Sequence, residues 1–231
     1  MYKSSVLINY DFFKEKNSIK RLINTFFLKK KILKKKRIYS EVAKIFLKLN
    51  KKYDEKLRII DVGCGTGQST IDLGLAFLSS EIMGIDIALK KLYFASKIKN
   101  FLKISNIEFI EHDAQKEFEG FGKFDLILCS DFINKFDSQT EIFLNICKML
   151  KNKESLLSLK MYSKNSGINT YFFDKIAQII NLTNLKIHDY TFDHKYFDQS
   201  LCKEKNLNKL EEIKVFEKII RPTTCTLILK K

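Results

Sequence analysis

A glycine-rich turn after a short apolar stretch constrains the fold of this chain more than any other feature of its sequence. The apolar stretch Leu57-Arg-Ile-Ile60 leads into Asp61-Val-Gly-Cys-Gly-Thr-Gly67, and a helical pattern follows from about Gln68 to Leu78. Glycine has no Cβ and tolerates positive φ angles, so a ligand can lie against the bare backbone of such a turn. Three glycines alternate along it: Gly63, Gly65 and Gly67.

The spacing of these glycines indicates which ligand the turn binds. A dinucleotide-binding turn has its third glycine three positions after the second, where the helix holds a pyrophosphate. That position is Gln68 here, and the glycines alternate instead. A second apolar stretch, Ile82-Met-Gly-Ile-Asp86, ends in an acid about twenty residues past the turn, where such folds place the carboxylate that binds ribose hydroxyls. The alternative is a plain tight turn with Asp61 and Asp86 capping strand ends, but two acids at this separation favour a nucleoside-bearing cofactor.

Alternating glycines after a strand-ending acid resemble motif I of the class I S-adenosylmethionine (SAM) methyltransferases. The resemblance implies an α/β, Rossmann-like fold with a doubly wound, mostly parallel seven-stranded sheet, an antiparallel last strand and an N-terminal helical cap. It also implies SAM as the cofactor and a SAM-dependent methyltransferase as the activity. We expect residues 1–56 to form the cap and residues 57–231 to form the SAM-binding domain, together one structural domain.

The pattern after the turn alternates between helix and strand, as a doubly wound sheet requires. The predicted helices are Ala88–Asn100, Gln139–Leu150 and Tyr171–Ile180. The predicted strands are Ile107–Glu111, Phe124–Ser130, Leu156–Tyr162, Leu185–Phe192 and Thr224–Leu229, of which the last two are expected to form an antiparallel pair.

The resemblance assigns the first cofactor contacts to residues of the turn and of the next strand end. The turn, with Cys64 inside it, would approach the methionine and ribose parts of SAM, and Asp61 would lie near the cationic amino group. Asp86 would accept hydrogen bonds from both ribose hydroxyls, and Ile87 follows it in the predicted site.

Two further strand ends complete the site that the resemblance implies. In His112-Asp113-Ala114, Asp113 would accept from the adenine amino group and the N–H of Ala114 would meet a ring nitrogen. The alternative for Asp113 is an acid that caps a loop turn. Ser130 would lie over the sulfonium. No catalytic residue is assigned.

The sequence around the transfer site favours an acceptor that needs no general base. Ser130-Asp-Phe132 lacks the Asn/Asp-Pro-Pro-Tyr/Phe arrangement of enzymes that methylate base or amide nitrogens. A carboxylate is already ionised at pH 7 and requires no base, unlike an alcohol or an ammonium. The one cluster of ionisable residues, His188–His194, alternates between two faces of a strand, with Ile187 and Asp189 on the same face, so we predict no metal site there.

The formal net charge of +15 indicates attraction to anionic partners, but only four of the 42 basic residues are arginines. A lysine-dominated excess favours general attraction over specific reading of phosphates or bases. The run Lys29–Arg37 is either a solvated helix face, a membrane-surface element, or a dock for an acidic acyl-carrier protein or RNA. No stretch is long and apolar enough to cross a bilayer, and no signal peptide is evident, so a cytoplasmic location is expected.

A weaker resemblance extends to the malonyl-acyl-carrier-protein O-methyltransferases of biotin synthesis. It lies in Asn9-Tyr-Asp11, in the glycine turn and in Phe124-Asp-Leu-Ile-Leu128; the departures are Asn134-Lys-Phe136 and Leu150-Lys-Asn-Lys-Glu154. It implies O-methylation of a carboxylate on an acidic carrier protein. The alternatives are a tRNA or rRNA methyltransferase and a non-catalytic assembly factor that keeps the SAM fold. The sequence does not fix the oligomeric state.

Overall fold

The computed structural model describes residues 56–130, 139–162, 172–192, 208, 209, 211 and 224–230. The chain divides into two compact units, Met1–Tyr39 and Ser40–Lys231, and all of the described residues belong to the second. The predicted helical cap and the lysine run at 29–37 lie outside the described residues.

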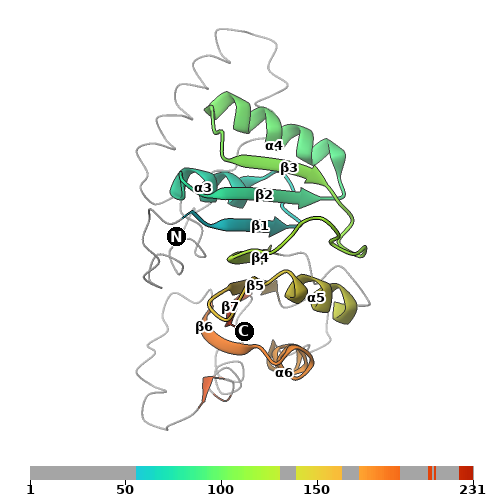
Figure 1. The fold of residues 1–231 in the computed structure, drawn as a ribbon. Coiled ribbons are helices and arrows are strands. Elements are labelled where there is room, and N and C mark those ends of the chain that lie inside the picture. The colour runs from blue at the N-terminus through green and yellow to red at the C-terminus, as the bar shows by residue number, and fades with distance from the viewer. Residues whose placement is uncertain are drawn as a thin grey trace. The chain divides into compact units, whose positions relative to one another are not determined.

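The described part is a sheet with helices between its strands (Figure 1). The strands are β1 (Arg58–Val62), β2 (Glu81–Asp86), β3 (Ile107–Glu111), β4 (Leu126–Ser130), β5 (Leu156–Tyr162), β6 (Lys186–Phe192) and β7 (Thr224–Lys230). The helices are α3 (Gln68–Ala76), α4 (Leu89–Leu102), α5 (Gln139–Lys148) and α6 (Phe172–Thr183).

The strand order is β3-β2-β1-β4-β5-β7-β6, and β7 runs antiparallel to both of its neighbours. The pairs β1–β2, β1–β4, β2–β3 and β4–β5 are parallel. The predicted seven-stranded, mostly parallel sheet with an antiparallel last strand is therefore confirmed. The chain order reverses at β1, which has β2 on one side and β4 on the other. In open α/β sheets, ligands bind beyond the carboxyl ends of the strands at such a switch point.

The pairing of β6 with β7 corrects one prediction. Ile187 pairs with Leu229 and Asp189 pairs with Ile228, so the register shifts at His188. Leu229 and Ile228 are consecutive on β7 and face opposite sides of the sheet. Their partners therefore face opposite sides as well, and the predicted placement of Ile187 and Asp189 on one face is wrong, because a bulge interrupts the period-two alternation.

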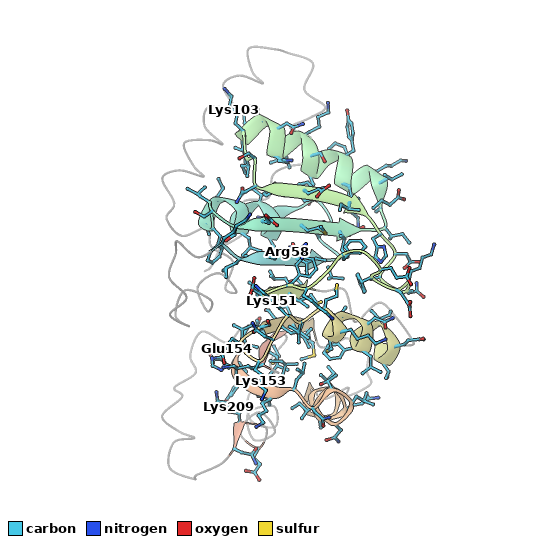
Figure 2. The ribbon with its side chains drawn as sticks, in the orientation of Figure 1. Arg58, Lys103, Lys151, Lys153, Glu154 and Lys209 are labelled. Carbon is cyan, nitrogen blue, oxygen red and sulfur yellow. The ribbon has the colours of Figure 1, made fainter. Side chains whose placement is uncertain are left out.

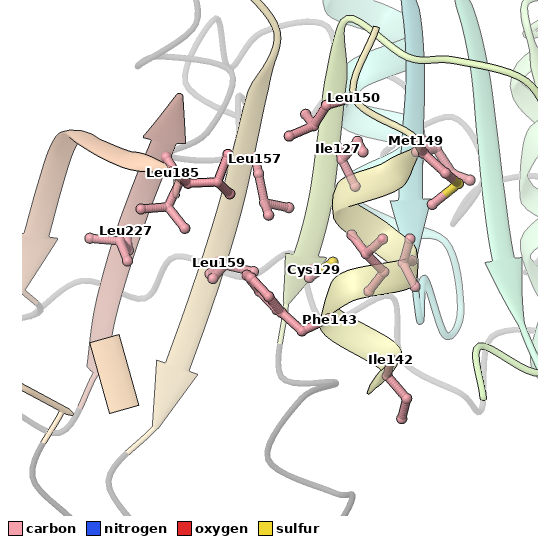
Figure 3. Packing of buried hydrophobic residues seen from close by; sticks show 14 of the residues in the cluster. Ile127, Cys129, Ile142, Phe143, Met149, Leu150, Leu157, Leu159, Leu185 and Leu227 are labelled. Atoms are coloured by element: carbon pink, nitrogen blue, oxygen red, sulfur yellow. The ribbon is translucent and has the colours of Figure 1, made fainter. Parts of the chain in front are cut away.

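The core lies where the central strands are covered on both faces. Ile59, Ile60 and Ile127 have no exposed surface, which explains why consecutive residues of these parallel strands are apolar instead of alternating with polar ones. Figure 3 shows α5 packed beside β4 and β5, with Phe143 of the helix near Leu159. No disulfide joins the cysteines of the described part.

A polar network at the amino edge of the sheet gives the first prediction. Asp125 is 5% exposed, and its Oδ2 accepts a hydrogen bond from the N–H of Arg58 at 2.9 Å. Its Oδ1 accepts one from Lys151 Nζ at 3.1 Å, and Figure 2 labels both Arg58 and Lys151. We expect Asp125→Ala to lower the free energy of unfolding by about 1–3 kcal/mol, because the partly buried N–H of Arg58 loses its acceptor. Urea titration measures this, and an unchanged midpoint would contradict it.

Candidate functional site

The glycine turn is fixed to the end of the neighbouring strand. The N–H groups of Gly63 and Cys64 both donate to the carbonyl of Ile85, at 2.8 and 2.9 Å. The φ angles of Gly63, Gly65 and Gly67 are 74°, 58° and 75°, a left-handed region that side chains disfavour. The turn then feeds directly into α3. The backbone conformation of the turn therefore favours glycine at these three positions, as the sequence pattern predicts.

The glycines differ in what surrounds them. A Cβ on Gly67 would lie 2.6 Å from Phe109 Cζ and 2.8 Å from the Cβ of Ala95, and one on Gly84 would lie 2.7 Å from Phe109 Cδ1. These two glycines allow close packing inside the domain. At Gly65, by contrast, no atom of the described residues lies within 4 Å of the Cβ position. Gly65 is therefore a point of the turn where a ligand can approach the backbone.

Asp86, the acid at the end of β2, holds the backbone at Gly65 in place by a hydrogen bond. It is 9% exposed, its Oδ2 accepts from the N–H of Gly65 at 2.8 Å, and its Oδ1 accepts from the N–H of Ala88 at 2.8 Å. A carboxylate has about four lone-pair positions, so each oxygen can accept a second bond from a ligand hydroxyl. Ile87, next to it, is 62% exposed and offers apolar surface at the same edge.

Asp61, the acid at the end of β1, is almost fully buried. Its Oδ2 accepts from Thr70 Oγ1 at 2.7 Å, which ties the strand end to α3. Burial raises the pKa of Asp61 to about 6, and the nearby charge of Asp86 acts in the same direction. A cation bound beside Asp61 would favour its ionised form. Burial also raises the pKa of the Cys64 thiol well above its usual range, so Cys64 is not a thiolate nucleophile.

The segment after β3 joins the same edge. The N–H of His112 donates to the carbonyl of Asp86 at 3.2 Å. Asp113 Oδ1 accepts from the N–H of Gln115 at 3.0 Å, so this acid does cap a turn, the alternative to a ligand contact considered from the sequence. Its second oxygen has no hydrogen bond from the described residues. Ala114 is buried at 4% exposure.

His112 lies outside the set of predicted site residues. The structure places its side chain between two aromatic rings. Its ring centroid lies 4.9 Å from that of Phe118 and 4.7 Å from that of Phe121. Within the described part of the chain, its buried Nε2 has no hydrogen-bond partner. Burial lowers the pKa of His112, which favours the neutral imidazole. These surroundings of His112 follow from contacts in the folded chain, and no local sequence pattern indicates them.

Ser130 is the last residue of β4, and Cys129 before it pairs with Val62 of β1. Ser130 therefore reaches the same carboxyl edge as the glycine turn. His188 does not, because β6 is the outer strand at the far end of the sheet order. Among the described residues, no three His, Cys, Asp or Glu side chains gather closely enough to hold a metal ion.

Asp72 on α3 gives a pH-dependent prediction. Burial raises its pKa to about 8 from 3.8, so the folded protein keeps a proton that the unfolded chain releases between these values. The free energy of unfolding should therefore decrease as pH rises through this interval. We expect a lower urea midpoint at pH 8 than at pH 6.5. Asp72→Asn should flatten this difference, and an unchanged difference would contradict the assignment.

The sheet order and the turn define a Rossmann-like domain with a site for a nucleoside-bearing cofactor. A family model described as "Methyltransferase domain" matches residues 53–217, most of the chain, and the chain belongs to this family. It is thus a member of the class I SAM-dependent methyltransferases, whose cofactor is SAM. The predicted superfamily and cofactor are confirmed. None of the described helices is long and apolar enough to cross a bilayer.

Individual relatives agree with the family. The Bacillus subtilis (strain 168) protein named "Putative methyltransferase YqeM" is 29% identical over 170 residues, which cover 70% of this chain and 61% of that protein. A TehB-like SAM-dependent methyltransferase from Corynebacterium glutamicum ATCC 13032 superposes with a TM-score of 0.57 at 14% identity, covering 93% of this chain and 100% of that one. PKMT2 from Rickettsia typhi, in complex with AdoHcy, has a TM-score of 0.61 at 14% identity, covering 76% and 48%. The chain spans about three fifths of the length of the Bacillus relative.

Proposed function

We propose that this protein transfers the methyl group of SAM to a carboxylate, with a malonyl group on an acyl-carrier protein of the biotin pathway as the first acceptor to test. The observation that carries the cofactor part is the open backbone at Gly65, held by a nearly buried Asp86 at the switch point of the sheet. The carboxylate acceptor rests on the state of the ionisable side chains around the turn.

These side chains already accept hydrogen bonds within the fold or pack against aromatic rings, which does not suit the role of a general base. Asp61 accepts from Thr70, Asp86 accepts from two backbone N–H groups, and one oxygen of Asp113 caps a turn. The side chain of His112 lies between two phenylalanine rings. A carboxylate acceptor is already ionised at neutral pH and needs no proton removed.

In this proposal the described residues position the cofactor from four strand ends, those of β1, β2, β3 and β4. The backbone at Gly65 lies against the methionine and ribose parts, and Asp86 accepts from the ribose hydroxyls. Asp61 stabilises the amino group by its charge. The remaining contacts come from Ile87, from Asp113 and Ala114 on the adenine side, and from Ser130 near the sulfur, with Gly63, Cys64 and Gly67 shaping the turn.

When bound, SAM supplies a methyl group on a positively charged sulfur that is open to in-line displacement. The contribution of the chain is then to hold cofactor and acceptor in line and to exclude water. Asp61 and Asp86 fix the cofactor at two separate points, which limits its rotation. The acceptor has to approach the methyl group on the side opposite the sulfur, and the sulfur is proposed to lie near Ser130.

The test is transfer of radiolabelled methyl from SAM to malonyl-loaded acyl-carrier protein, followed by mild base. We expect label on the carrier that base releases as volatile methanol, the behaviour of a methyl ester. Unlabelled carrier would contradict the carboxylate proposal. Base-stable label in RNA from a cell extract would favour the second candidate, a tRNA or rRNA methyltransferase, which the net charge of +15 supports. SAM binding without transfer to any component would indicate a non-catalytic assembly factor.

A further inference from the structure

Helix α4 combines exposed apolar side chains with an unbalanced positive charge. It packs on β2 and β3 through one side, on which Leu92, Ala95 and Ile98 are buried (Figure 1). Its sequence contains four lysines and no acid. Leu89 and Tyr93 are 60% and 59% exposed, and they lie one helical turn apart. We call the exposed surface formed by Leu89, Lys90, Tyr93 and Lys97 the α4 face.

The positive charge of the α4 face is not neutralised by the described residues. The salt bridges of the described part join Lys56 and Arg58 to Glu81, Lys151 to Asp125, and Lys230 to Glu154, and none involves a lysine of α4. Lys97 Nζ instead lies 5.1 Å from the centroid of the Tyr93 ring. The face therefore presents an apolar centre flanked by ammonium groups.

This chemistry favours an acidic protein segment over a nucleic acid. Exposed Leu89 and Tyr93 provide surface that an apolar side chain of a partner can cover, and Lys90 and Lys97 match carboxylates around it. Nucleic-acid recognition relies strongly on arginine, which binds phosphates and guanine in a bidentate way. Arg58, the only arginine of the described residues, lies at the amino edge and donates to the carbonyls of Lys123 and Phe121.

The α4 face also lies next to the candidate cofactor site. Ala88, the residue before the helix, donates its N–H to Asp86 Oδ1, so the helix starts at the carboxylate that is proposed to bind ribose. Leu89 follows directly, and Tyr93 lies about 6 Å further along the helix axis. The amino end of this surface therefore lies beside the proposed ribose contact.

We propose that the α4 face docks an acidic protein segment that presents the methyl acceptor to the cofactor site. This inference rests on the proposed function in one respect, that the acceptor is carried by an acidic protein.

The probe is a fluorescently labelled acyl-carrier protein, titrated with the SAM-loaded enzyme and followed by anisotropy. The double variant Lys90→Gln/Lys97→Gln should raise the Kd about tenfold, since each exposed ion pair contributes modestly. The variant Leu89→Ser/Tyr93→Ser tests the apolar centre and should also weaken binding.

A matched control removes the same charge elsewhere. Lys148→Gln/Lys153→Gln changes two exposed lysines, one on α5 and one before β5, and should leave the Kd unchanged (Figure 2 labels Lys153). The docking surface would be overturned if the carrier bound wild type and both double-lysine variants equally, or if it did not bind wild type. It would also be overturned if Lys90→Gln/Lys97→Gln lost affinity for a single-stranded RNA but kept wild-type affinity for the carrier.

Transfer assays separate this inference from the proposed function. A carrier-free malonyl thioester should be methylated equally well by wild type and by Lys90→Gln/Lys97→Gln, whereas the KM for the carrier-bound group should rise in the variant. If the carrier binds through α4 but is never methylated, the surface stands and the carboxylate proposal fails. If the carrier is methylated with the same KM by both proteins, the carboxylate proposal stands and the surface fails.

Discussion

Replacing Gly65 with valine should abolish SAM binding while leaving the sheet folded. No atom of the described residues lies within 4 Å of the Cβ position of Gly65, so the new side chain meets no described protein atom there. It fills the space through which the cofactor would approach the backbone. The φ angle of 58° adds strain of about 1–2 kcal/mol, which should lower stability without unfolding the domain. Isothermal titration calorimetry with SAM measures the loss, and circular dichroism verifies the fold.

Gly120 provides a matched control for this substitution. Its φ angle is 78°, and no atom of the described residues lies within 4 Å of its Cβ position. It lies beside Phe121, whose carbonyl accepts a hydrogen bond from the Arg58 side chain, and it has no hydrogen bond to the glycine turn among the described contacts. Gly120→Val therefore introduces a comparable backbone strain away from the turn and should keep wild-type affinity for SAM. Equal binding by Gly65→Val and Gly120→Val would contradict the site.

Asp86→Ala should weaken SAM binding at least about 100-fold. The substitution removes the acceptor for the ribose hydroxyls, and hydrogen bonds to a charged group contribute about 1.5–3 kcal/mol each. It also leaves the N–H groups of Gly65 and Ala88 without their acceptor, which loosens the turn. Asp86→Asn should lose less, because one carbonyl oxygen remains.

The control for Asp86 is its register partner on the next strand. Glu111 pairs with Asp86 across β2 and β3, is exposed, and has no hydrogen bond to the glycine turn among the described contacts. Glu111→Ala removes one carboxylate from nearly the same place, so it controls for the change in local charge. Calorimetry with SAM should show wild-type affinity for Glu111→Ala. A similar loss in both variants would mean that charge at this edge, and not the ribose contact, governs binding.

The sequence predicts the bounds of two strands fully. β3 and β5 begin and end where expected, because each is a short segment rich in apolar residues between turn residues. Phe124 and Asp125 were expected in the fourth strand, but β4 begins at Leu126. Phe124 makes only an isolated bridge with Leu150, and the Asp125 side chain is held by Arg58 and Lys151.

The geometry of the turn could be predicted in part. Motif spacing was enough to predict the positive φ angles of Gly63, Gly65 and Gly67, because the backbone requirement of the turn is local. It could not show that Gly67 is closed by Phe109 while Gly65 is open, since those neighbours come from distant segments. The bulge at His188 likewise depends on the pairing of β6 with β7, which no local pattern encodes.

The placement of SAM at the glycine turn is tested most directly by a SAM titration of isotope-labelled protein, followed by the backbone amide resonances in two-dimensional NMR. We expect the amides of Gly65 and Ala88, both bound to the Asp86 carboxylate, to shift with the same saturation curve. The amides of Gly120 and Gly122 in the β3–β4 connection should stay in place. Shifts of Gly120 and Gly122 without shifts of Gly65 and Ala88, or no shifts at saturating SAM, would contradict the placement of the cofactor at the glycine turn.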